Sequence, residues 1–85
     1  MNRYRVTVSP GADRQISKLP KADKSGILNK IESLGDNPRP YGFKKLVHYT
    51  DFFRVRSGNY RIIYNIVDRE LIVSVVEVTD RRDAY

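Results

Sequence analysis

Arg54, Arg56 and Arg61 are the residues whose type and spacing best suggest chemistry in this chain. A guanidinium group is always charged, and its planar fork suits bidentate contacts with a phosphate group. The intervening Gly58-Asn59 is a two-residue loop typical of a tight β-hairpin, which would place Arg56 directly opposite Arg61. Like charges in that position destabilise a strand pair, whereas a bound anion would relieve the repulsion. We therefore predict that the three arginines form a phosphate-binding surface, called here the arginine platform.

The residues around the arginines predict which face of this hairpin is buried. Apolar and polar residues alternate through two runs, 53–57 and 60–66, and successive side chains of a strand point to opposite faces. The apolar face is predicted to carry Phe53, Val55, Tyr60, Ile62 and Tyr64, with Phe53 opposite Tyr64 and Val55 opposite Ile62. This face is expected in the core, which leaves the arginine platform on the open face.

The rest of the chain predicts an α+β domain with the element order βααββββ. A β-branched run at Tyr4–Ser9 predicts a first strand, and Ser9-Pro10 supplies a helix N-cap followed by proline. Apolar residues at helical spacing predict one helix as far as Pro20 and a second from Pro20 to about Gly35. Further strands are predicted at 43–49, 53–57, 60–66 and 71–78. We expect the helices to form an N-terminal hairpin on one face of an antiparallel sheet, in a single domain spanning residues 1–85.

Composition and charge limit the classes of protein to which this chain can belong. The sequence has 85 residues, no cysteine and a single histidine, His48, which excludes disulfides and thiolate metal sites and argues against a histidine cluster or catalytic triad. Lysine and arginine number 16 against 10 acids, and the net charge of +6 predicts a polyanionic partner such as nucleic acid. No stretch resembles a membrane span or a signal peptide, so we expect a cytoplasmic protein with no membrane partner, no cofactor and no metal.

Further residues could extend the platform, although each also has an ordinary structural role. Lys44 and Lys45 add positive charge beside the hairpin, but lysines are also typical of an exposed strand edge. Arg81 and Arg82 follow the last predicted strand, so the tail could return over the platform or form only a basic extension. Tyr85 could stack on a nucleobase or pack on the core.

The platform itself has a purely structural alternative, because basic residues on an open sheet face also discourage aggregation. His48 lies in a predicted strand and is expected to be structural rather than catalytic. Tyr41, Tyr49 and Tyr64 are expected in the core or at its rim. No pair of carboxylates is spaced for acid–base catalysis.

The stretch FRVRSGNYRIIY at 53–64, together with VTDRRDAY at 78–85, resembles the RelE/ParE superfamily of prokaryotic toxin–antitoxin toxins. The resemblance covers almost the whole chain, including the Leu19-Pro20 break between the helices. It implies the RelE-like microbial RNase fold and, in the RelE branch, a type II toxin that enters the ribosomal A site, cuts mRNA there and inhibits translation. It also implies a cognate antitoxin, acidic and partly disordered, that wraps the toxin with a helix in a hetero-oligomer.

The resemblance also implies roles for individual residues. The resemblance assigns catalysis to Arg54, Arg56, Arg61, Arg81 and Tyr85. It assigns RNA binding to Lys44, Lys45 and Arg82. In this set Arg61 binds phosphate and Tyr85 stacks on or orients a base. Two departures bear on the mechanism: Arg54 and Arg56 stand where the best-studied members have lysine, and Thr-Asp-Arg at 79–81 replaces the frequent Gly-His-Arg. No histidine is therefore available there as an acid or base.

Two other functions stay open on the sequence alone. A ParE-like toxin uses the same fold to inhibit DNA gyrase without cutting nucleic acid, and an inactive basic module would only bind RNA or an antitoxin. The complete set of arginines with a terminal tyrosine favours the RelE-like ribonuclease, which needs no metal and uses the 2′-OH of its substrate. A gyrase inhibitor would not need this set.

Overall fold

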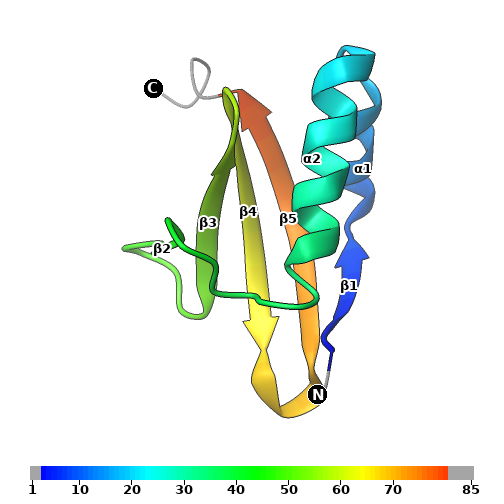
Figure 1. Cartoon of the computed structure of the whole chain (residues 1–85). Coiled ribbons are helices and arrows are strands. Elements are labelled where there is room, and N and C mark those ends of the chain that lie inside the picture. Colours follow the sequence, from blue (N-terminus) through cyan, green and yellow to red (C-terminus); the bar gives the residue numbers. More distant parts are fainter. Residues whose placement is uncertain (1–2, 81–85) are drawn as a thin grey trace.

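The computed structural model describes residues 3–80 and confirms the predicted α+β class and element order (Figure 1). The elements are β1 (Arg5–Val8), α1 (Pro10–Ser17), α2 (Lys21–Ser33), β2 (Lys44–Lys45), β3 (Phe52–Ser57), β4 (Tyr60–Val67), the 3-10 turn η1 (Asp68–Glu70) and β5 (Ile72–Asp80). The predicted site residues Arg81, Arg82 and Tyr85 lie outside the described residues. Within residues 3–80, no helix is long and apolar enough to cross a membrane.

The strands form one sheet in the order β1-β5-β4-β3-β2. Strands β2 to β5 are antiparallel to their neighbours, whereas β1 runs parallel to β5 with Arg5 opposite Ile72. The sheet is therefore mixed, and the prediction of a wholly antiparallel sheet is wrong at this one edge. The physical reason is connectivity: β1 leads directly into α1 and cannot form a hairpin with the next strand, so its partner is the last strand of the chain.

The predicted hairpin is confirmed in its register. Gly58 has a φ of +59°, the left-handed conformation that a two-residue hairpin loop requires. Across the loop, Ser57 pairs with Tyr60, Arg56 with Arg61, Val55 with Ile62 and Phe53 with Tyr64. The loop residues and the alternation of the flanking runs together determine this pairing.

The helices cover one face of the sheet and close the core (Figure 1). Helix α1 begins as predicted, with the Ser9 hydroxyl accepting a hydrogen bond from the Ala12 N–H at 3.1 Å and Pro10 in the first turn. Helix α2 follows directly after Pro20. The buried core joins Ala12, Ile16, Ile27, Ile31 and Leu34 to Phe53, Val55, Ile62, Tyr64, Ile66, Val73, Val75 and Val78. The apolar face of the hairpin is thus buried, which leaves the arginine platform on the opposite face.

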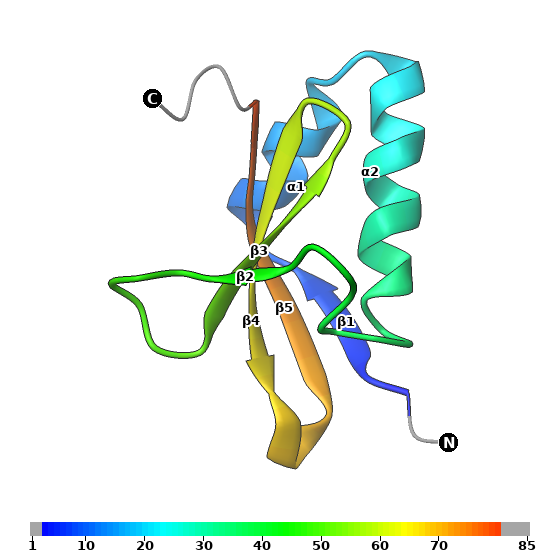
Figure 2. The same cartoon turned by 60° about the vertical axis from the view of Figure 1, so that its left-hand side comes forward.

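The second predicted strand is much shorter than expected. The sequence favours a strand at 43–49, but only Lys44–Lys45 pairs with β3, followed by one hydrogen bond from the Leu46 N–H to the Phe52 carbonyl at 2.9 Å. Residues 47–51 are exposed and turn back to β3, on the side of the sheet away from α2 (Figure 2). The partner of β2 is β3, which begins at Phe52, so residues 47–51 form the turn between the two strands and β2 ends at Lys45.

Candidate functional site

The arginine platform lies on the face of the sheet that the helices leave open. Arg56 and Arg61 are directly opposite each other across β3 and β4, and Arg54 lies two residues before Arg56 on the same face. Arg56 is exposed, whereas Arg54 and Arg61 are half-buried. The sheet thus holds the three arginines at neighbouring positions on one face, as the sequence predicts.

Only one of the two predicted lysines adjoins the platform. Lys44 is directly opposite Arg54, so both side chains project from the same face of the sheet. Lys45 is opposite Phe53 and therefore projects from the other face, although at the exposed edge. The structure brings Lys44 together with the arginines and separates Lys45 from them.

Ile63 and Glu77 lie on this face beside the arginines and are absent from the predicted site. Ile63 pairs with Arg54 on one side and with Glu77 of β5 on the other, so all three lie in one row across the sheet. Glu77 is half-buried and adds an acid at the β5 side of a face that looks purely basic in the hairpin alone. Sequence reasoning missed Glu77 because its register depends on a bulge in the β4–β5 pairing between Ile63 and Tyr64.

A cavity of about 560 Å³ lies beside the platform. It is lined by Tyr41, Gly42, Lys44, Arg54, Val55 and Arg56. This volume falls within the range of small-ligand sites, roughly 300–1,000 Å³. Three cations on its walls make it suitable for a phosphate group and unsuitable for a cation.

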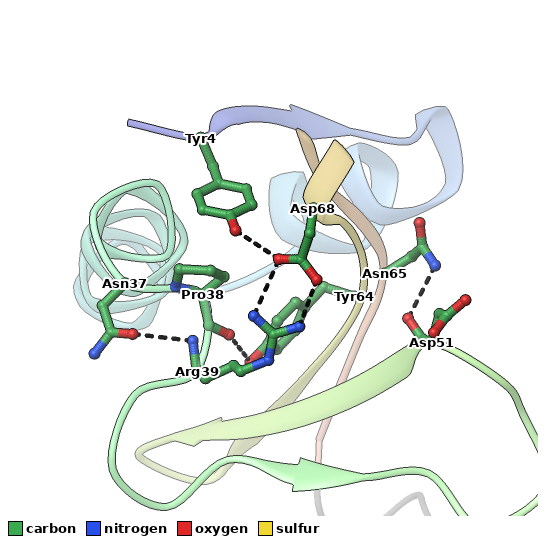
Figure 3. Close-up of polar contacts among 8 residues, drawn as sticks. All are labelled: Tyr4, Asn37, Pro38, Arg39, Asp51, Tyr64, Asn65 and Asp68. Carbon is green, nitrogen blue, oxygen red and sulfur yellow. Dashed lines mark hydrogen bonds and ion pairs between the residues drawn. The ribbon is translucent and has the colours of Figure 1, made fainter. Parts of the chain in front are cut away.

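The loop between α2 and β2 forms one side of this cavity and is held in place by several contacts (Figure 3). The buried Tyr64 hydroxyl donates a hydrogen bond of 2.7 Å to the Pro38 carbonyl. The Arg39 guanidinium lies over the Phe53 ring, 5.7 Å from its centroid, and the Arg39 N–H donates to the Asn37 side-chain oxygen at 3.1 Å. This wall of the cavity is therefore tied to the sheet beneath it.

Asp68 provides the remaining contact to the loop (Figure 3). Arg39 donates to both of its carboxylate oxygens, at 3.1 and 2.8 Å, and the Tyr4 hydroxyl donates to one of them. The hydrogen bonds from Arg39, and then from Tyr4, lower the pKa of Asp68 from 3.8 to about 2. The same contact with Asp68 raises the pKa of Tyr4. Three parts of the chain that are distant in sequence, the residue before β1, the loop between α2 and β2, and η1, thus meet at one carboxylate.

This network predicts a small acid-sensitive contribution to stability. Because the pKa of Asp68 is depressed in the folded state, its contribution is present above about pH 3.8 and is lost as the pH falls towards 2. The side chains of Arg39 and Asp68 are 42% and 53% exposed, so this contribution should not exceed about 1 kcal/mol, the upper value for surface ion pairs. Thermal unfolding of the wild type and of Asp68→Asn should show a difference in Tm at pH 7 that shrinks below pH 3.8. A difference independent of pH would contradict the assignment.

Of the three tyrosines predicted in the core or at its rim, one is buried. Tyr64 has no exposed surface, and burial raises its pKa to about 12, so it stays protonated and donates to Pro38. Tyr49 is 62% exposed and Tyr41 is fully exposed, so the prediction is wrong for these two. Both lie in loops, where no strand alternation turns a side chain towards the core.

The arrangement can bind and stabilise phosphate groups but offers few groups for proton transfer. Arginine stays protonated near neutral pH and is a poor base there. Within residues 3–80, no group of three or more His, Cys, Asp or Glu side chains comes together that could hold a metal ion. What the described part of the site offers is positive charge in a fixed geometry.

Comparison with known proteins identifies the family. A family model described as the ParE toxin of type II toxin–antitoxin systems matches residues 6–85. A relative in Escherichia coli, described as a RelE-like toxin protein, is 31% identical over 98% of this chain and 90% of its own length.

Solved structures show the same fold. The archaeal RelE–RelB complex from Pyrococcus horikoshii contains a chain that is 26% identical, with a TM-score of 0.82, covering 93% of this chain and 96% of that one. The toxin–antitoxin complex RelBE2 from Mycobacterium tuberculosis gives 27% identity and a TM-score of 0.83, covering 93% and 99%. Together with the family match, this likeness shows that the chain is a toxin of the RelE/ParE superfamily and belongs to the ParE toxin family of type II toxin–antitoxin systems.

Proposed function

We propose that this toxin is a ribosome-dependent endoribonuclease that cuts mRNA in the A site and thereby inhibits translation. The observation that carries the proposal is the arginine platform, which the fold holds on the open face with Lys44 beside it. Like-charged side chains directly opposite each other cost stability, so a bound polyanion gives the arrangement a purpose. By family resemblance, the complete set of Arg54, Arg56, Arg61, Arg81 and Tyr85 supports the same activity. This function places the protein in the cytoplasm.

The reaction that fits the platform uses the substrate's own 2′-OH. The 2′-oxygen loses its proton and forms a bond to phosphorus, while the bond to the 5′-oxygen breaks and that oxygen gains a proton. The products carry a 2′,3′-cyclic phosphate and a 5′-OH. In between, the phosphorus is bonded to five oxygens and carries extra negative charge, which preorganised cations stabilise strongly.

The residues divide these tasks according to their chemistry. Arg54, Arg56 and Arg61 hold the phosphate and stabilise its charge, and by family resemblance Arg81 joins them while Tyr85 orients a base. Proton transfer falls to the ribosome–mRNA environment, to an arginine acting as acid, or to Tyr85, since arginine is a poor base.

A cognate antitoxin is the second partner of this proposal. The structurally similar chains from Pyrococcus horikoshii and Mycobacterium tuberculosis come from toxin–antitoxin complexes. The net charge of +6 on this chain favours an acidic partner by electrostatic complementarity. We therefore propose a hetero-oligomer in which an acidic, partly disordered antitoxin wraps the toxin with a helix.

A ParE-like inhibitor of DNA gyrase is the alternative function. One observation favours it: the family model that matches residues 6–85 is that of the ParE toxin. Such a toxin would inhibit gyrase without cutting RNA, and the arginine platform would be dispensable for its activity.

Mapping mRNA 5′ ends on programmed ribosomes distinguishes the two functions. The purified protein is expected to cut within the A-site codon, and Arg54→Ala and Arg56→Ala are each expected to slow cleavage about tenfold or more, through the loss of a charge-assisted contact. Arg69→Ala is the matched control, because Arg69 is exposed in η1 and outside the platform. Intact mRNA, together with gyrase-dependent DNA breaks, would favour the ParE-like function instead.

A further inference from the structure

We propose that Tyr41 is a base-stacking residue and that the cavity beside the arginine platform is a subsite for single-stranded RNA. In this subsite the cationic wall holds a phosphate while the Tyr41 ring stacks on a neighbouring nucleobase. The inference rests on the proposed function, because it assumes that the platform binds RNA, and it adds a residue that holds the nucleobase next to the bound phosphate.

The backbone presents Tyr41 at the tip of a tight turn. The Phe43 N–H donates a hydrogen bond of 3.0 Å to the Pro40 carbonyl, which closes a four-residue β-turn. Gly42 has a φ of +92°, the conformation that a type II turn requires at its third position. Tyr41 occupies the second position of this turn and is fully exposed.

The turn is fixed on both sides, so its position is preorganised. Before it, the Pro38 carbonyl is bonded to Tyr64, and Arg39 is bonded to Asp68 (Figure 3). After it, Lys44 pairs with Arg54 in the sheet. A side chain on a rigid support loses less freedom on binding a ligand than one on a mobile loop.

The surroundings of Tyr41 favour nucleic acid over a protein partner. Its neighbours along the cavity are Lys44, Arg54 and Arg56, and these cations are suited to phosphate. The apolar depression of the open face is a different one, lined by Leu46, Tyr49, Phe52, Ile63, Val76 and Glu77. A basic groove with an aromatic side chain at its edge is the combination that binds single-stranded nucleic acid without sequence-specific hydrogen bonds.

The size of the cavity agrees with this ligand. Its volume of about 560 Å³ falls in the range of sites that hold a small organic ligand, about 300–1,000 Å³. A Cβ atom built on Gly42 would meet no atom within 4 Å, so the space beside Gly42 in this turn is open.

The sequence contains no tryptophan, so a single substitution creates a specific fluorescent reporter. The Tyr41→Trp variant is titrated at low salt with a short single-stranded RNA and, separately, with inorganic polyphosphate. We expect the RNA to quench the emission of the introduced tryptophan through stacking, and polyphosphate to bind with little quenching. Leu28→Trp is the matched control, because Leu28 is 46% exposed on α2, on the helix side of the sheet, and should not respond.

Binding measured by anisotropy of labelled RNA provides the second readout. Tyr41→Ala is expected to weaken binding about tenfold, as the loss of one stacking contact does, whereas Tyr41→Phe keeps the ring and should bind as the wild type does. On programmed ribosomes, Tyr41→Ala should raise KM and leave kcat nearly unchanged, because stacking acts equally on substrate and transition state.

The outcomes separate this inference from the nuclease activity. If Tyr41→Ala cleaves mRNA on ribosomes with an unchanged KM, the stacking site is overturned but the nuclease is not. The same holds if RNA binds Tyr41→Trp without quenching its fluorescence. If the short RNA quenches Tyr41→Trp but the mRNA on programmed ribosomes stays intact, the stacking site is supported and the nuclease is overturned. Equal quenching by RNA and polyphosphate would show that only phosphate is bound and would overturn base stacking.

Discussion

Arg61→Ala is expected to slow mRNA cleavage on programmed ribosomes by about 100- to 1,000-fold, the loss typical of removing one preorganised donor to a charged transition state. Arg61 lies on β4, inside the sheet, with Arg56 opposite on one side and Thr79 on the other. It is half-buried, so its charge is less screened by water than that of the exposed Arg56. Single-turnover cleavage at saturating toxin measures this rate without interference from binding.

Two variants control this measurement. Arg61→Lys keeps the charge but loses the planar fork, so it should retain part of the activity and fall between the wild type and Arg61→Ala. Arg69→Ala removes an exposed arginine from η1 and should leave the rate unchanged. A thermal unfolding curve for each variant shows that the fold is intact. Cleavage by folded Arg61→Ala at the wild-type rate would refute the role of the platform in the reaction.

The hairpin and its platform could be predicted because their determinants are local. Gly58 supplies the positive φ of the loop, and the alternation of 53–57 and 60–66 assigns each side chain to a face. The same alternation predicts which face of the hairpin is buried. Val55 and Ile62, which pair across the two strands, are both buried. Ser9 and Pro10 likewise identify the start of α1 from a few adjacent residues.

The features that could not be predicted depend on contacts between distant segments. The parallel pairing of β1 with β5 joins the two ends of the described chain, and no residue in either strand specifies its neighbour. The position of Glu77 depends on a bulge, and β2 ends early because residues 47–51 form the turn that leads back to β3. The exposure of Tyr41 follows from the anchoring of its loop by Tyr64 and Asp68, which the sequence around it does not reveal.

The same anchoring links the stability of the core to the geometry of the site. The like-charged pair Arg56–Arg61 costs stability, and the apolar pairs on the other face of the same strands, Val55–Ile62 and Phe53–Tyr64, offset that cost. Tyr64 contributes to both, because its ring packs in the core while its hydroxyl holds the loop that carries Tyr41. A change at Tyr64 should therefore affect the fold first and the site through it.

Tyr64→Ala is expected to lower the free energy of unfolding by about 3–5 kcal/mol, the cost of removing a fully buried aromatic ring. Native proteins have a free energy of unfolding of only about 5–15 kcal/mol, so this variant should be only marginally stable at 25 °C. Urea denaturation followed by circular dichroism measures the change. The matched control is Tyr41→Ala, a tyrosine lost from a fully exposed position, which should change stability by less than about 0.5 kcal/mol.

Tyr64→Phe separates the hydroxyl from the ring. It keeps the packing but leaves the buried Pro38 carbonyl without the 2.7 Å hydrogen bond, which should cost about 1–3 kcal/mol. Burial raises the pKa of Tyr64 from 10.0 to about 12, so the folded state holds this proton more tightly than the unfolded state does. The contribution is therefore complete below pH 10 and is lost as the pH rises towards 12. The difference in stability between the wild type and Tyr64→Phe should shrink across that window, and a constant difference would show that burial does not raise the pKa of Tyr64.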